Sequence, residues 1–178
     1  MKILSCLGLA VAALALGACS ATLPVANPHD GRAVADAVLV QHNRSGKTTD
    51  YVGPRVPSGI SIAFLYAQKN SSTGNIAYEI RVIDNYYGPR QWTYYIYDNV
   101  SVHGIGARNV KLHVFPSLPS QCTWGQCLYE DFVILDVSHQ YLAEHARSGL
   151  GFKVFSRTSE TAFFLPGAYI KAFLSVAS

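Results

Sequence analysis

Apolar and polar residues alternate along much of the chain between residues 60 and 165, which is typical of β-strands with one face in a core. The stretch Ile76–Ile83 places its apolar residues on one face and Glu79 and Arg81 on the other, which we expect to meet solvent. Phe64 and Tyr66 share one side of Ile60–Ala67. Similar patterns predict strands over Ala35–His42, Trp92–Val102, Val110–Phe115, Leu128–Val137, Gly151–Arg157 and Ala162–Leu165, with a loop over Thr48–Gly59.

Helical spacing replaces this alternation twice near the C-terminus. Ser138 is a good N-cap for a short helix over His139–Arg147, with Gly149 just beyond its end. Pro166 introduces a second helix over Gly167–Val176. About seven short strands separated by turn signals indicate an antiparallel β-sandwich. The sequence therefore predicts a mainly β fold with two short C-terminal helices.

The N-terminus has the features of an export signal. Lys2 precedes an apolar run from Ile3 to Leu16, and the segment ends in Leu16-Gly17-Ala18-Cys19. This ending resembles the lipobox of bacterial lipoproteins, which implies that Cys19 carries a thioether-linked diacylglycerol and becomes the first residue after cleavage. The alternatives are a signal peptide with a coincidental cysteine and an uncleaved membrane helix, which would need about 20 apolar residues.

The resemblance also implies where the protein is located. Ser20 follows the cysteine in place of the aspartate that usually retains such lipoproteins at the inner membrane, so we expect the periplasmic face of the outer membrane. We expect residues 1–18 to be a signal peptide, residues 19–33 a lipidated tether rich in turn residues, and residues 34–178 a single domain. The membrane is then one partner, reached through the lipid on Cys19.

Charge excludes one class of partner. The chain has 14 basic and 11 acidic residues and no run of Lys or Arg, so it lacks the basic patch of a nucleic-acid-binding protein. No nucleic-acid partner is expected.

Cys122 and Cys127 are expected to form a local disulfide in an oxidising compartment. The alternatives are a metal pair or a redox couple. A zinc site would need two more ligands at suitable spacing, and a thioredoxin-like couple has two residues between its cysteines rather than four.

Catalytic motifs are not recognisable. The chain has no Gly-x-Ser-x-Gly motif, and the adjacent carboxylates Glu130 and Asp131 would point to opposite faces of a strand. His103 and His113 are the one histidine pair that could meet across a hairpin. We therefore predict no catalytic residues, no metal site and no cofactor.

The aromatic stretch Tyr86–Tyr97 is the most suggestive surface. Alternation sends Tyr95 and Tyr97 to the face opposite Trp92, and exposed aromatic rings are common in interfaces and sugar-binding platforms. The candidate binding residues are Arg90, Tyr95, Tyr97 and Trp124, the last on the disulfide loop. The alternative is that the terminal helix covers this face and makes it part of the core.

These observations favour a lipid-anchored cell-envelope lipoprotein that acts as a non-catalytic binding or assembly-support module with an envelope protein partner. A first alternative is a binder of a glycan or small hydrophobic molecule that uses the Tyr-rich strand. A second alternative is an envelope hydrolase.

Overall fold

The computed structural model describes residues 23–87, 96–99, 111–116, 121–123, 126–155 and 160–178. Its helices are α2 (Gly31–Ala37), α3 (His139–His145) and α4 (Gly167–Val176). Its strands are β1 (Leu39–His42), β2 (Thr48–Val52), β3 (Val56–Ser58), β4 (Ser61–Asn70), β5 (Ile76–Tyr87), β6 (Ile96–Asn99), β7 (Lys111–Pro116), β8 (Gln121–Thr123), β9 (Gln126–Val137), β10 (Leu150–Phe155) and β11 (Glu160–Leu165). The predicted mainly β, antiparallel fold with short C-terminal helices is confirmed.

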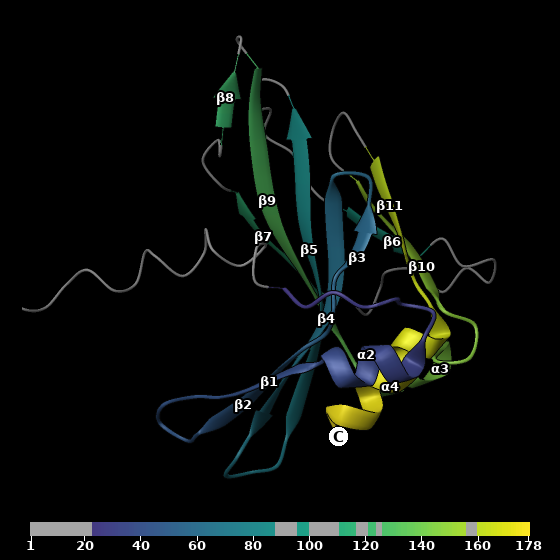
Figure 1. Ribbon diagram of the computed structural model, residues 1–178. Coiled ribbons are helices and arrows are strands. Elements are labelled where there is room, and N and C mark those ends of the chain that lie inside the picture. Colours follow the sequence, from purple (N-terminus) through teal and green to yellow (C-terminus); the bar gives the residue numbers. More distant parts are fainter. Residues whose placement is uncertain (1–22, 88–95, 100–110, 117–120, 124–125, 156–159) are drawn as a thin grey trace, which may run out of the picture.

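Two antiparallel sheets form a sandwich-like body. The large sheet has the order β1-β2-β4-β5-β9-β7, with β3 beside β4 and β8 beside β9, and the small sheet has the order β11-β10-β6. Figure 1 shows β11 lying beside β3, where the Ser58 hydroxyl donates to the carbonyl of Ala162 at 2.6 Å. The Thr161 hydroxyl also donates to Asp84 Oδ1 at 3.1 Å. Side chains therefore link the two sheets along this edge.

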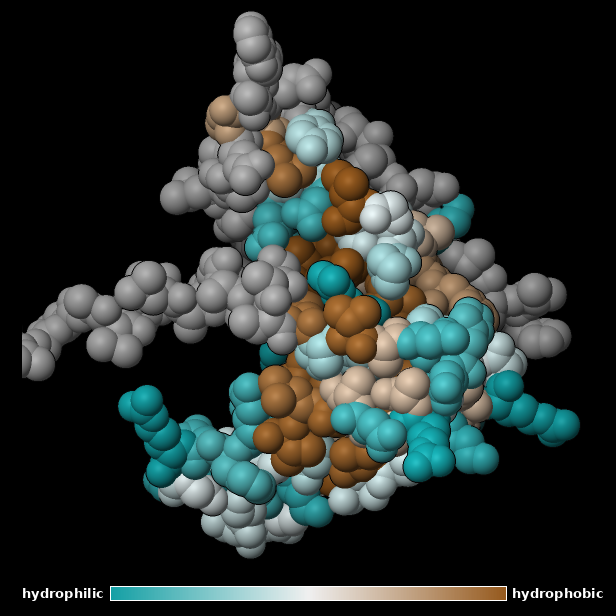
Figure 2. Space-filling view, viewed as in Figure 1, coloured by the Kyte–Doolittle hydropathy of each residue, from teal (hydrophilic) through white to brown (hydrophobic). Residues whose placement is uncertain are grey.

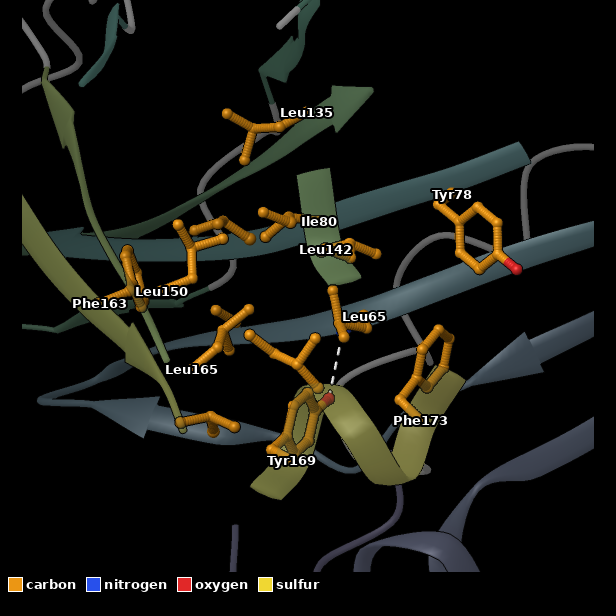
Figure 3. Close-up of a cluster of buried hydrophobic side chains, with 14 of the residues drawn as sticks. Leu65, Tyr78, Ile80, Leu135, Leu142, Leu150, Phe163, Leu165, Tyr169 and Phe173 are labelled. Carbon is orange, nitrogen blue, oxygen red and sulfur yellow. Dashed lines mark hydrogen bonds between the residues drawn. The ribbon is translucent and has the colours of Figure 1, made fainter. Parts of the chain in front are cut away.

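The core lies between the large sheet, the small sheet and the helices (Figure 3). Ala63 and Leu65 of β4 and Ile80 and Val82 of β5 are fully buried on one side of the large sheet, which we call the core face. Helix α4 covers this region with buried side chains at helical spacing: Tyr169, Ile170, Ala172 and Phe173. Burial of such large apolar side chains is the main stabilising contribution to the fold.

The Tyr169 hydroxyl bridges the gap between β2 and β3 along the edge of β4. Both strands pair with the same side of β4, and between them Gly53 N–H donates to the Leu65 carbonyl at 2.9 Å. The Leu65 N–H donates to the Tyr169 hydroxyl at 3.1 Å (Figure 3). This hydroxyl in turn donates to the Pro54 carbonyl at 2.8 Å. A Cβ on Gly53 would lie 2.5 Å from the hydroxyl oxygen, so this position requires glycine.

The N-terminal part of the domain differs from the sequence-based expectation. Helix α2 begins at Gly31, within the expected tether, because Asp30 accepts hydrogen bonds from the N–H groups of Arg32 and Ala33. The following strand therefore starts at Leu39 rather than Ala35. Further upstream, the Pro24 carbonyl accepts a hydrogen bond from Arg55 N–H at 2.9 Å.

The prediction of a loop over Thr48–Gly59 is also wrong, since this range contains β2 and β3. Pro57 suggested a loop because proline cannot donate to a strand ladder. Among the described strands, β3 pairs only with β4 within its sheet, and such an edge position tolerates a proline.

Candidate functional site

Three of the four binding residues proposed from the sequence, Arg90, Tyr95 and Trp124, lie outside the described part of the chain, as does the predicted lipidation site Cys19. Tyr97 lies in β6, where its backbone pairs with Val154 of β10. At the start of the aromatic stretch, Tyr86 stacks on Tyr129 with ring centroids 5.4 Å apart, and Tyr87 is 64% exposed. The predicted platform therefore remains a prediction for all of its named residues.

The predicted disulfide joins Cys122 of β8 to Cys127 of β9, with Sγ atoms 2.09 Å apart. The two cysteines are cross-strand partners. The bridge therefore closes the β8–β9 hairpin at one end of the large sheet (Figure 1).

A cavity lies on the outer face of the large sheet, which we define as the side opposite the core face. The register places Phe64 of β4 opposite Arg81 of β5, and Ile83 of β5 opposite Phe132 of β9, on this outer face. Phe64 is 3% exposed and Ile83 is 2% exposed. The expectation that this face simply meets solvent is therefore wrong, because large apolar side chains are buried on both sides of β4 and β5.

The cavity has a volume of about 230 Å³ and is lined by Leu23, Leu39, Gln41, Asp50, Val52, Phe64, Tyr66, Arg81 and Phe132. The β1–β2 hairpin supplies four of these side chains as two cross-strand pairs, Leu39 with Val52 and Gln41 with Asp50. Leu23 comes from the segment that leads to α2. Figure 2 shows hydrophobic residues in brown over the middle of the molecule.

Arg81 is held by aromatic and acidic neighbours. Its guanidinium carbon lies 3.3 Å from the centroid of the Tyr66 ring and 5.8 Å from that of Phe132, within the range of cation–π attraction. Its Nε donates to Glu79 Oε2 at 2.7 Å. This bond orients the guanidinium group and does not engage its two Nη groups.

A second polar cluster borders the same cavity. The Gln68 amide donates to Asp50 Oδ1 at 2.9 Å and to the Tyr66 hydroxyl at 3.2 Å. Burial, together with a hydrogen bond to Asp50, raises the pKa of the Tyr66 hydroxyl to about 12. Tyr66 therefore stays neutral and keeps its proton at physiological pH.

Two buried aspartates that are distant in the sequence form a separate feature of the fold. Asp84 and Asp131 are cross-strand partners on β5 and β9 and are 4% and 2% exposed. Asp84 accepts hydrogen bonds from Ser61 and Thr161, so its carboxylate connects the large sheet to the small one. This arrangement gives Asp84 a structural role.

Metal binding has no support in the described segments, where no three His, Cys, Asp or Glu side chains gather in a suitable group. Of the histidine pair considered from the sequence, His103 lies outside these segments. The same segments contain no helix that is both long and apolar enough to span a membrane.

Comparisons of the chain with protein-family models, curated proteins and solved structures found no match. The cavity on the outer face is a ligand-sized feature of the described residues. Sequence reasoning missed it because its lining combines residues from five strands and a preceding segment. The alternation along Ile76–Ile83 did predict that Arg81 shares a face with Glu79. The β1–β2 hairpin, which completes the cavity wall, was expected to be partly loop.

Proposed function

We propose that the protein is a lipid-anchored lipoprotein of the cell envelope whose β-domain acts as a non-catalytic binding or assembly-support module. The observation that carries this proposal is the short distance along the chain between Cys19 of the lipobox-like motif and Leu23 at the cavity wall. An extended residue spans at most about 3.6 Å. An acylated Cys19 would therefore lie within about 14 Å of Leu23.

Such a short connection suits a module that works at the membrane surface. The Pro24–Arg55 hydrogen bond holds the chain to the domain one residue after Leu23. Residues 24–33 therefore add little to the distance between the lipid and the domain. We expect the domain to stay close to the periplasmic face of the outer membrane. An envelope protein partner would then be met near that surface, with Arg90, Tyr95, Tyr97 and Trp124 as candidate contacts.

The anchor is tested by intact-mass analysis and membrane fractionation of the purified protein. We expect a chain that begins at Cys19 with added diacylglycerol and acyl mass, and we expect Cys19→Ala to lose this modification. A chain that retains Met1, or one that begins at Cys19 without fatty acids, would contradict the anchor.

The assembly role is tested by crosslinking in intact envelopes. Wild-type protein and a Tyr95→Ala/Tyr97→Ala double variant are compared at matched amounts in the membrane fraction. We expect one partner to be lost from the variant, and an unchanged set of partners would remove these tyrosines from the proposal.

A second candidate function is ligand binding, and the cavity on the outer face favours it. It fits the expected alternative of a small hydrophobic ligand, although its lining includes no residue of the Tyr86–Tyr97 stretch. Apolar walls with a few polar groups are typical of small-molecule sites.

A further inference from the structure

The walls of the cavity are mainly apolar and come from strands of the large sheet and the segment before α2. Its apolar side chains are Leu23, Leu39, Val52, Phe64 and Phe132. At about 30 Å³ per water-sized unit, the volume of 230 Å³ suits roughly eight non-hydrogen atoms. A phospholipid is far larger than this, but one segment of an unbranched hydrocarbon chain fits both the volume and the walls.

The polar side of the cavity favours hydrogen-bond acceptors at Arg81. Three charged side chains lie around this side, Arg81, Glu79 and Asp50, together with the neutral hydroxyl of Tyr66. Glu79 offsets the charge of Arg81 and Asp50 accepts from Gln68, so the site does not attract a multiply charged anion. The Nη groups of Arg81 suit a single carboxylate or an ester oxygen, the groups that end an acyl chain.

The position of the cavity also points to a membrane-derived ligand. Leu23 forms part of its wall, and Cys19 precedes Leu23 by four residues. If Cys19 is acylated, the cavity lies within reach of the bilayer surface, where acyl chains are abundant. This source rests on the proposed anchor, whereas the fit of an acyl chain to the cavity does not.

We propose that the outer-face cavity binds an acyl chain of an amphiphile, with the chain among Leu39, Val52 and Phe64 and its carboxylate or ester oxygens at Arg81. The ligand is non-covalent and no reaction is involved. The acyl chain comes either from a free fatty acid or from a phospholipid of the bilayer, and the two sources are separated by experiment.

The test is photolabelling of the full chain in phosphatidylcholine vesicles. One arm contains palmitic acid with a diazirine in its chain, and the other contains phosphatidylcholine with the same labelled chain. We expect adducts on peptides from β1, β2 and β4, mapped by mass spectrometry, and displacement by excess unlabelled palmitic acid. Adducts from the acid alone identify a free fatty acid, and adducts from both probes identify bilayer chains.

Leu39 and Val40 provide a matched pair of variants. They are adjacent on β1 and similarly exposed, at 39% and 42%, but only Leu39 lines the cavity. We expect Leu39→Trp to fill the cavity and lower labelling about tenfold, equivalent to about 1.4 kcal/mol, while Val40→Trp leaves it unchanged. Thermal unfolding of both variants verifies that they are folded.

Several results would overturn the proposal. These are the absence of cavity adducts with both probes, equal labelling of Leu39→Trp and the wild type, or no displacement by palmitic acid. Displacement is measured on the wild type, so it does not depend on the folding of a variant. Repeating the labelling with Cys19→Ala separates the two proposals, because cavity binding should persist in that variant even if the anchor is absent.

Discussion

The two faces of β4 and β5 are both buried, but they are built differently. The core face carries Ala63, Leu65 and Ile80, all fully buried and covered by α4 and the small sheet. The outer face carries larger side chains, among them Tyr66 and Arg81, and leaves a cavity beneath the N-terminal segment. A packed protein core is normally filled without gaps of this size. The outer face has buried apolar side chains and yet contains such a gap, so burial alone does not identify the packed core.

The first prediction tests the core face. We expect Leu65→Ala to lower the free energy of unfolding by about 2–5 kcal/mol, because Leu65 is fully buried and the space left cannot be refilled. Urea denaturation of the purified protein measures this change. A cost below about 1 kcal/mol would mean that the core face is not tightly packed.

The second prediction concerns the hydroxyl that completes the β2–β3 edge. Tyr169→Phe removes the partner of the Leu65 N–H and the Pro54 carbonyl, so we expect a loss of about 1–3 kcal/mol in the free energy of unfolding. Tyr78→Phe is the matched control, since the Tyr78 hydroxyl makes one longer bond, of 3.4 Å, to the Ala177 carbonyl. An equal effect of the two variants would contradict this role of Tyr169.

The third prediction addresses the outer face. Arg81→Met keeps an unbranched apolar stem but removes the guanidinium group, and with it the stacking on Tyr66 and the bond to Glu79. We expect about 1 kcal/mol or less of lost stability, because such partly exposed interactions are weak. Urea denaturation again provides the measurement, and a loss as large as that of Leu65→Ala would show that the outer face is as important to the fold as the core face.

The fourth prediction concerns the free energy of unfolding at alkaline pH, and no effect is expected at neutral pH. Since the pKa of Tyr66 is raised to about 12 in the folded protein, its ordinary value near 10 applies only after unfolding. The unfolded chain therefore binds fewer protons above pH 10, and the free energy of unfolding falls as the pH rises toward 12. We expect a shallower fall for Tyr66→Phe in denaturation series between pH 9 and 12, and identical slopes would contradict this explanation.

Local signals in the sequence predicted the C-terminal part of the fold well. Helix α4 has the expected bounds, Gly167–Val176, because Pro166 and the helical spacing of large apolar residues mark it clearly. Ser138 caps α3 through its bond to Tyr141 N–H, as expected. The helix ends at His145 rather than Arg147, a difference of two residues that is within the usual fraying of helix ends.

The outer face could not be predicted because it depends on contacts between distant segments. The alternation of β4 was correct, but it does not reveal that Ala63 and Leu65, rather than Phe64 and Tyr66, meet the core. The pattern also could not show that β2 and β3 share one side of β4. That arrangement depends on Tyr169, more than 100 residues along the chain.

The place of Tyr169 in the chain has a consequence for biosynthesis. Its hydroxyl completes an edge near residues 53–65, yet it belongs to the last helix. A ribosome that has made residues 1–166 has produced all of the strands that the structure describes, but none of α4. The two hydrogen bonds of the Tyr169 hydroxyl can therefore form only after α4 has been synthesised, and until then the edge near residues 53–65 lacks these two partners.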